Sequence, residues 1–280
     1  GWLTVTDVMR EQAPVLEAFA KEVRNAGFRH LVLLGMGGSS LGPEVLRQTF
    51  GSAPGYPKLI VLDSTVPGWV QGVADAIDPA RALFIVSSKS GSTTEPNMFY
   101  LYFRGLVEKA VGKDQAGQHF IAITDPGSTL ETLAREQGFR RLFLNPTDIG
   151  GRYSVLSYFG LVPAALAGMD LLKLLDRADC MREGCASCVP AHENPGAWLG
   201  VTMGVLAQHG RDKLTLVTSP SIGSFGLWVE QLIAESTGKE GKGIVPVADE
   251  PLAAPDRYGA DRLFVYLRLE GDDNAGTDAA

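Results

Sequence analysis

Residues 84–95, FIVSSKSGSTTE, have the residue types and the spacing of a loop that binds an oxyanion. A β-branched apolar run ends here in hydroxyl side chains, one lysine and one glycine, ahead of a segment with helical patterning. Hydroxyls and the unpaired N–H groups of a first helical turn together suit a phosphate. The alternative is a loop whose hydroxyls only cap the helix, but one hydroxyl is enough for a cap. The candidate phosphate-binding residues are Ser88, Lys89, Ser90, Gly91, Ser92 and Thr93.

A second loop of this kind lies in residues 30–42, HLVLLGMGGSSLG. Gly35 and Gly37 fit the first half of the dinucleotide motif G-x-G-x-x-G, but Ser40 stands where the third glycine belongs, so a dinucleotide site is not expected. The glycines either let the backbone approach a ligand closely or only form a tight turn. No G-x-x-x-x-G-K-[ST] motif occurs, which argues against a nucleoside triphosphate.

Composition limits the classes of function. The chain has 280 residues, 45% of them hydrophobic, and no run approaches the roughly 18 to 20 apolar residues of a membrane span. The first residues, GWLTVTDVMREQ, do not resemble a secretory signal, so a cytoplasmic location is expected. With 25 basic and 32 acidic residues, neither nucleic acid nor a membrane is an expected partner. Positive charge for an anion must therefore be local, and Lys89 and Arg152 are the candidates.

Three cysteines, Cys180, Cys185 and Cys188, lie close together and are followed by His192. The spacing is near that of zinc ligands. Structural zinc sites usually draw their ligands from two separated segments, whereas all four residues here would come from one. We therefore predict free thiols and no metal site.

Apolar runs alternate with helical patterns through the first half of the chain. Strands are expected over 31–34, 58–62, 83–87, 119–124 and 141–144. Helices are expected over 10–25, 43–50, 68–76, 96–111 and 128–137. This alternation predicts an α/β fold with a doubly wound parallel sheet and a ligand at the carboxyl ends of its strands. Asp63, at one of these strand ends, is interpreted as a turn residue.

The second half predicts a smaller unit of the same kind. A long helical stretch is expected from Tyr153 through Asp179, and strands follow at 213–218 and 262–268. LFIVSSKSGS from Leu83 and LTLVTSPSIGS from Leu214 align as a faint repeat, with Pro220 opposite Lys89. We therefore expect two similar subdomains, residues 1–152 and 153–280, of which only the first binds phosphate.

The segments GMGGSSLGPE, SSKSGSTTEP, ITDPGSTLE, GGRYSVLSYFGL and EQLIAESTGKEGKGIVPV together resemble the glucose-6-phosphate isomerases of the sugar isomerase (SIS) superfamily. The resemblance implies two flavodoxin-like, three-layer αβα subdomains, the second incomplete. It also implies a cytoplasmic enzyme of glycolysis and gluconeogenesis that needs no metal or other cofactor. The opening GWL and the segment AESTGKEGKG are most similar to the isomerase part of bifunctional transaldolase/phosphoglucose isomerases, so either a homodimer or a transaldolase fusion is expected.

The resemblance also implies roles for particular residues. Glu235 matches the carboxylate that moves a proton between C1 and C2 through a cis-enediol, and Arg152 matches an arginine that stabilises the enediolate. Gln231 matches a ligand-contacting glutamine one helical turn before Glu235. The pair Gly38 and Ser39 matches the first sugar-contacting residues, and residues 88–93 match the phosphate loop. Taken alone, Glu235 would be interpreted as a solvated acid at a helix end, and Arg152 could equally well form a domain-bridging ion pair.

The chain departs from the family pattern in one respect. The family's later histidine for ring opening and its C-terminal lysine have no matching motif, and His30, His119, His192 and His209 receive no role. A fragment of a longer protein is therefore expected. Two alternatives stay open: a non-catalytic SIS module that binds a sugar phosphate, and an isomerase of another phosphosugar such as mannose 6-phosphate.

Overall fold

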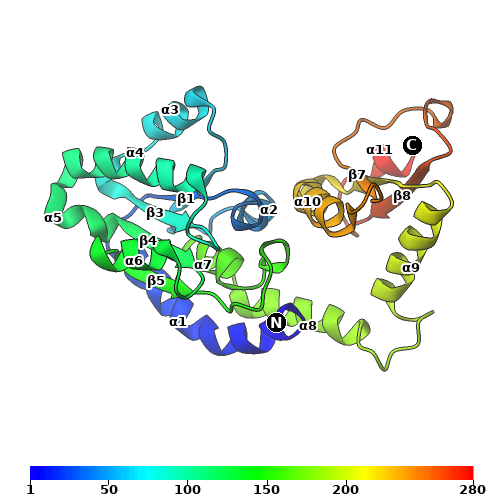
Figure 1. Ribbon diagram of the computed structural model, residues 1–280, viewed down its shortest axis with the longest axis horizontal. Helices are drawn as coiled ribbons and strands as arrows, with labels where there is room; N and C mark the ends of the chain where they lie inside the picture. Colours follow the sequence, from blue (N-terminus) through cyan, green and yellow to red (C-terminus); the bar gives the residue numbers. More distant parts are fainter. Residues whose placement is uncertain (280) are drawn as a thin grey trace. The chain divides into compact units, whose positions relative to one another are not determined.

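The computed structural model describes residues 1–279 of the chain. These residues form two compact units, which divide between Asp176 and Arg177 (Figure 1). Each unit contains a parallel β-sheet of its own.

Five parallel strands form the sheet of the first unit. They are β1 (His30–Leu34), β2 (Lys58–Leu62), β3 (Ala82–Ser87), β4 (Phe120–Thr124) and β5 (Arg141–Leu144). Their order across the sheet is β2-β1-β3-β4-β5, and each neighbouring pair is parallel. All five strands expected from the sequence are confirmed, because buried parallel strands retain uninterrupted apolar runs that the sequence displays directly.

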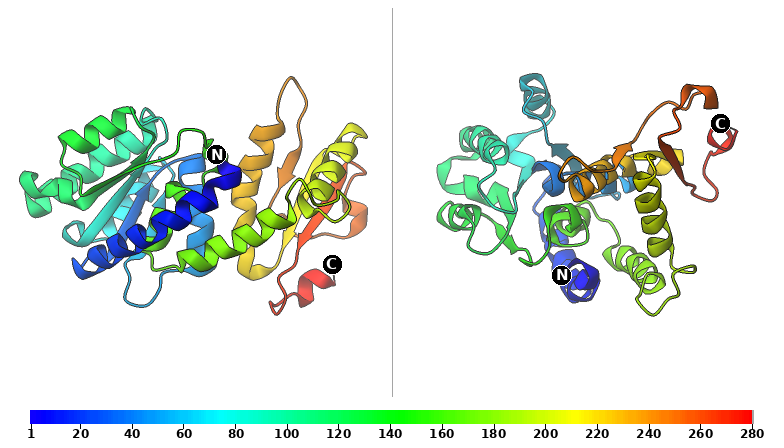
Figure 2. Two further views of the ribbon diagram at one scale, coloured as in Figure 1. Left: turned by 90° about the horizontal axis from the view of Figure 1, so that it is seen from below. Right: turned by 45° about the vertical axis from the view of Figure 1, so that its right-hand side comes forward.

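Helices cover both faces of this sheet (Figure 1, Figure 2). One face carries α1 (Val5–Asn25), α2 (Leu41–Phe50) and α7 (Tyr158–Leu166), and the other carries α3 (Pro67–Asp75), α4 (Thr94–Val111) and α6 (Thr129–Glu136). The short α5 (Lys113–Ala116) follows α4. Alternate residues of one strand reach opposite faces, so Leu31 and Leu33 join the first helical layer while Val32 and Leu34 join the second. The predicted three-layer αβα architecture is confirmed for this unit.

The long helical stretch expected from Tyr153 through Asp179 consists of two helices, α7 and α8 (Leu171–Gly184). Gly168 ends α7 with a φ of 81°, a left-handed conformation that favours glycine. Because α7 packs against α1 and α2, the first unit extends to Asp176, past the boundary expected after Arg152. Within residues 1–279, no helix has both the length and the apolar character needed to cross a bilayer.

The second unit contains a three-stranded parallel sheet in the order β7-β6-β8. Its elements are α9 (Pro195–Gln208), β6 (Lys213–Thr218), α10 (Phe225–Thr237), β7 (Val245–Val247), β8 (Arg262–Leu267) and α11 (Ala275–Asp278). Its core consists of Leu214, Leu216 and Val229, with side chains of α9 and β8 packed around them. The two strands expected here are confirmed, and among the described residues this sheet has fewer strands than the first.

The topology corrects the repeat expected from the sequence. After β6, the chain runs through α10 to β7 on one side and then returns to β8 on the other. In the first unit β1 has this position, followed by α2, β2 on one side and β3 on the other. Thus β6 corresponds to β1 and not to β3, although Ser219 resembles Ser88 in its local sequence. The segment that follows β8, rather than the one that follows β6, corresponds to the predicted phosphate loop.

Candidate functional site

The candidate residues of the first unit lie in loops that follow its strands. The 3-10 turn η2 (Gly37–Ser39) follows β1, the phosphate-loop candidate follows β3, and a second turn, η5 (Gly151–Tyr153), comes after β5. Because all five strands are parallel, these loops leave the same edge of the sheet. The hydroxyl of Ser87 donates a hydrogen bond of 3.0 Å to the carbonyl oxygen of Ser39 and so ties the β3 loop to the β1 turn.

The hydroxyls of the phosphate-loop candidate bond to one another. The Ser88 hydroxyl donates to Thr93 Oγ1 at 3.2 Å, and the hydroxyls of Ser90 and Ser92 lie 2.9 Å apart. Thr93 stands at the N-cap of α4 but makes no side-chain capping bond. The hydroxyls are therefore not engaged as caps, and they gather beside the positive end of an 18-residue helix. This arrangement favours anion binding over the capping alternative.

Gly91 fixes the shape of this loop. It has a φ of 71°, and a Cβ at this position would lie 2.6 Å from the backbone nitrogen of Leu130. Its carbonyl oxygen accepts hydrogen bonds from Thr129 Oγ1 at 2.8 Å and from Asn97 Nδ2 at 3.2 Å. Only glycine combines this backbone conformation with so close an approach, so the loop is pressed against the start of α6.

Lys89 is held by Asp125, a residue to which the sequence assigned no role. The Lys89 ammonium donates to Asp125 Oδ2, and the Asp125 N–H donates to the Lys89 carbonyl oxygen at 3.1 Å. Thr124 Oγ1 donates to the same carbonyl oxygen at 3.2 Å. Asp125 lies in the segment ITDPGSTLE at the end of β4, which the sequence had marked as a family motif. The sequence does not show that β4 lies beside β3, so it could not predict this contact.

The turn that carries Arg152 packs directly against Gly38. A Cβ at Gly38 would lie 2.5 Å from the carbonyl carbon and oxygen of Gly151. The Ser154 hydroxyl is 2.7 Å from the carbonyl oxygen of Gly151 and 3.3 Å from that of Gly38. The ring of Tyr153, in the same turn, stacks on the Trp2 ring with 5.2 Å between ring centroids. The first unit therefore brings the Arg152 turn next to Gly38 and Ser39.

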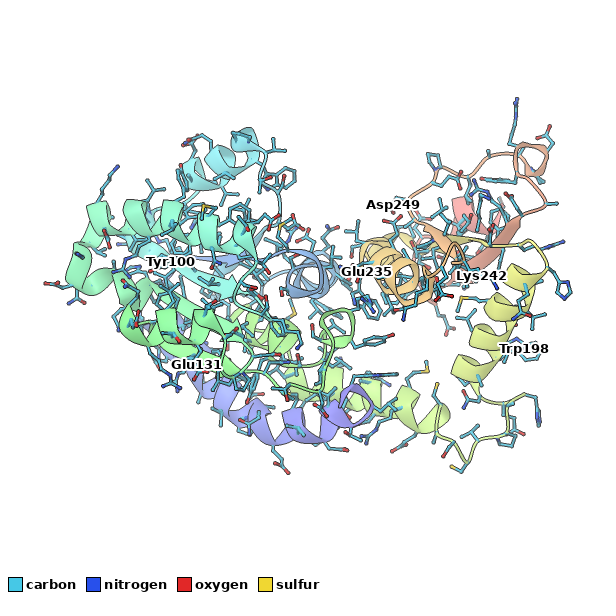
Figure 3. All side chains as sticks on the ribbon, viewed as in Figure 1. Tyr100, Glu131, Trp198, Glu235, Lys242 and Asp249 are labelled. Carbon is cyan, nitrogen blue, oxygen red and sulfur yellow. The ribbon has the colours of Figure 1, made fainter. Side chains whose placement is uncertain are left out.

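Gln231 and Glu235 belong to the second unit, on successive turns of α10, where Glu235 is exposed (Figure 3). Gln231 Nε2 donates to Glu235 Oε1 at 3.2 Å. Residues four apart on a helix share one face, and this bond orients the carboxylate along that face. The candidate base and the candidate glutamine are thus one local pair.

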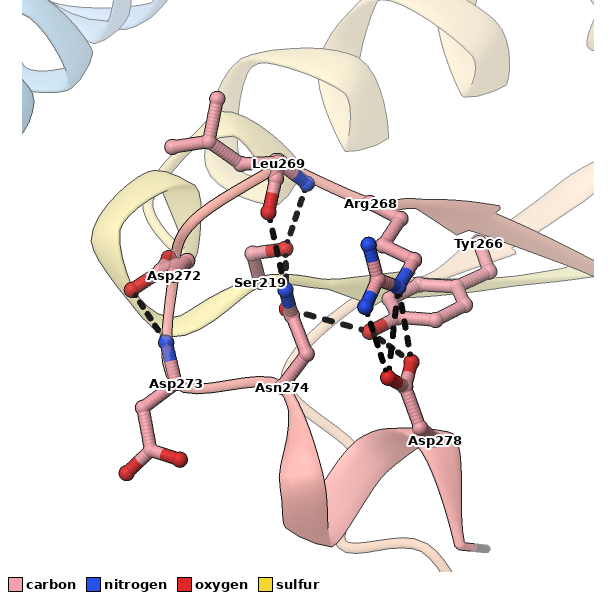
Figure 4. A network of polar contacts seen from close by, with 8 residues as sticks. All are labelled: Ser219, Tyr266, Arg268, Leu269, Asp272, Asp273, Asn274 and Asp278. Atoms are coloured by element: carbon pink, nitrogen blue, oxygen red, sulfur yellow. Dashed lines mark hydrogen bonds and ion pairs between the residues drawn. The ribbon is translucent and has the colours of Figure 1, made fainter.

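Acidic and amide side chains fill the position in the second unit that corresponds to the phosphate loop (Figure 4). In the segment after β8, Asp272 accepts hydrogen bonds from the Ser221 N–H at 2.9 Å and from the Ser221 hydroxyl at 3.0 Å. The bond from the Ser221 backbone, followed by the other donors around it, lowers the pKa of the Asp272 carboxyl. The Ser219 hydroxyl donates to Asn274 Oδ1 at 2.6 Å. These donors are satisfied by the chain itself, and the nearby carboxylates disfavour an anion.

The cysteine cluster shows no arrangement of metal ligands. The three cysteines are free thiols, and Cys185 Sγ lies 3.8 Å from Met181 Sδ. Among the described residues, no three His, Cys, Asp or Glu side chains are grouped so that they could hold a metal ion.

Asp63, at the carboxyl end of β2, was interpreted as a turn residue, and its carboxyl group also has a raised pKa. Burial raises the pKa of its carboxyl group, and the negative charge of Glu44 raises that pKa further. A carboxylate that is partly desolvated beside a like charge disfavours its own ionisation.

The family model for phosphoglucose isomerase matches residues 5–245 of the chain. A glucose-6-phosphate isomerase of Staphylococcus saprophyticus is 34% identical over 255 residues, which are 88% of this chain and 57% of that protein. The glucose-6-phosphate isomerase of Rubrobacter xylanophilus is 34% identical over 85% of this chain and 56% of its own length. The chain therefore spans a little over half the length of these relatives.

Two solved structures superpose on most of this chain. A hypothetical protein from Thermus thermophilus superposes with a TM-score of 0.77 and 26% identity, over 99% of this chain and 62% of that one. A glucose-6-phosphate isomerase from Chlamydia trachomatis superposes with a TM-score of 0.68 and 28% identity, over 84% of this chain and 46% of that one.

Proposed function

Because the chain belongs to the phosphoglucose isomerase family, we propose that it is an aldose–ketose isomerase that interconverts glucose 6-phosphate and fructose 6-phosphate. The observation that carries this proposal is the loop at residues 88–93, whose hydroxyls are paired with one another at the start of α4. Relatives named glucose-6-phosphate isomerase support the choice of substrate.

In this proposal the phosphate binds at residues 88–93. The side chains of Ser88, Ser90, Ser92 and Thr93 turn from one another toward the phosphate oxygens, and the first turn of α4 adds N–H groups. Gly38 and Ser39 contact the sugar from the β1 turn, which the Ser87 bond holds beside this loop. Phosphate binding then supplies free energy that holds C1 and C2 in place for proton transfer.

Glu235 is the proposed base. Its carboxylate takes the proton from C2 of the open-chain aldose, and the electron pair moves through C1 to the carbonyl oxygen, which gives the cis-enediolate. The protonated Glu235 then returns its proton to C1, while the proton of the C2 hydroxyl passes through water to O1 and C2 becomes the ketone carbon. Gln231 fixes the orientation of Glu235 by its hydrogen bond. Negative charge grows on oxygen during these steps, and the guanidinium of Arg152 stabilises it without losing a proton.

Membership of the same family supports our proposals for the partners and the location. We propose a phosphosugar as the substrate, a cytoplasmic setting, and either a homodimer or fusion to a transaldolase as the assembly. The proton transfer needs no metal and no redox cofactor, since a carboxylate and a guanidinium perform both steps.

Incubation with fructose 6-phosphate in deuterated water tests the activity. The proposal predicts glucose 6-phosphate with deuterium at C2, seen by NMR. Binding of the phosphosugar without conversion would favour a non-catalytic sugar-phosphate module, and mannose 6-phosphate as the main product would favour a different isomerase.

A further inference from the structure

The phosphate loop holds its lysine in a neutral pair. Lys89 is the only lysine or arginine in residues 84–95, and its ammonium contacts the Asp125 carboxylate. A phosphate that entered the loop would thus meet a cation that already has a partner. The contact spans two neighbouring strands, since Lys89 follows β3 and Asp125 follows β4.

The two partners differ in how firmly they are fixed. The Asp125 side chain is 15% exposed, whereas that of Lys89 is 35% exposed. The Asp125 backbone is also anchored, because its N–H donates to the Lys89 carbonyl oxygen. Lysine carries its charge on a flexible four-carbon stem, so its ammonium can turn toward another anion while the carboxylate stays in place.

We propose that Asp125 is a positioning residue that keeps Lys89 beside the loop and competes with the phosphate for its ammonium. The inference rests on the proposed function, because it requires a phosphosugar in the loop at residues 88–93. With Asp125 present, the pair has no net charge, so the loop binds the phosphate chiefly through hydroxyl and N–H donors. The carboxylate takes the ammonium back when the phosphosugar leaves, which limits affinity and favours product release.

Binding of 6-phosphogluconate, measured by calorimetry at low salt, tests the proposal. Asp125→Asn keeps the shape and the backbone N–H but frees the lysine, so affinity should rise by about three- to tenfold. Lys89→Gln leaves an unpaired carboxylate beside the phosphate, so affinity should fall by about the same factor. The double variant has neither charge and should lie between the single variants. Added salt should narrow all these differences, because it screens charges.

A matched control is the Lys213–Asp261 ion pair of the second unit, which has the same types of partner. Asp261→Asn should leave the affinity for 6-phosphogluconate unchanged. A purely structural role for Asp125 predicts the opposite pattern, in which Asp125→Asn weakens binding and the double variant binds no better than the weaker single variant. That pattern, or an unchanged affinity in Asp125→Asn, would overturn the inference alone. Absence of binding by the wild type would overturn the proposed function and the inference with it.

Discussion

Gly38 and Gly151 are in direct backbone contact, so close that a Cβ on Gly38 would lie 2.5 Å from the Gly151 carbonyl oxygen. The contact joins the turn after β1 to the turn that carries Arg152. Gly37 has a positive φ and so requires glycine for its backbone conformation, whereas Gly38 does not. The close contact with Gly151 explains the glycine at residue 38.

Gly38→Ala should therefore displace the Arg152 turn. We expect a loss of about 1–3 kcal/mol in the free energy of unfolding, because backbone atoms cannot give way as a flexible side chain can. Urea denaturation measures this loss. Gly72→Ala on α3 is the matched control, because outside the adjoining backbone of its own helix the added Cβ would meet no atom within 4 Å, and it should be neutral or slightly stabilising. Equal effects of the two substitutions would show that the close contact is unimportant.

Ser88→Ala combined with Thr93→Ala should weaken the binding of 6-phosphogluconate. Each hydroxyl that donates to a charged oxygen contributes about 1.5–3 kcal/mol, so the loss of two should lower affinity by at least about a hundredfold. Calorimetry measures the change, with Thr202→Ala on α9 as the control, because that hydroxyl donates to the Trp198 carbonyl oxygen of its own helix. An unchanged affinity in the double variant would place the phosphate elsewhere.

Asp63→Asn should stabilise the protein at neutral pH. Since burial raises the pKa of Asp63 in the folded state, the folded protein holds this proton more tightly than the unfolded chain does. Stability is therefore lost as the pH rises from the ordinary value of 3.8 through the raised folded value, and the neutral asparagine escapes this loss. The gain in melting temperature should be about 1–2 °C at pH 7, because the group is only partly buried. It should shrink as the pH falls toward 4, and a gain that is constant with pH would contradict this explanation.

The sheet of the first unit could be predicted from the sequence because its strands are buried on both faces. Residues 82–86 of β3 are all apolar, and the run ends abruptly at the hydroxyls that follow. Gly91 and Gly38 could also be singled out, since glycines beside hydroxyls at a strand end permit close approach to a ligand. Gln231 and Glu235 were identified by the family resemblance, and their spacing of four residues on a helix agreed with the pair that the structure shows.

The contacts that depend on strand order could not be predicted. Lys89 and Asp125 meet because β3 and β4 are neighbours, which no local pattern records. The repeat that aligned Ser88 with Ser219 failed for the same reason, because similar residues after two strands do not report where those strands lie in their sheets. The break at Gly168 was missed because a glycine inside an apolar helical pattern does not by itself reveal a positive φ.

The central claim is tested most directly by exchange of the C2 proton of glucose 6-phosphate with deuterated solvent. The full-length gene product serves as the enzyme, and NMR of the sugar phosphate monitors the exchange. Glu235→Gln keeps the size of the side chain and most of its hydrogen bonding but removes the base. Exchange and turnover should therefore fall by at least about 10²- to 10⁴-fold, while the affinity for 6-phosphogluconate changes little. If Glu235→Gln exchanges the proton at the wild-type rate, the base lies elsewhere and the proposed mechanism is wrong.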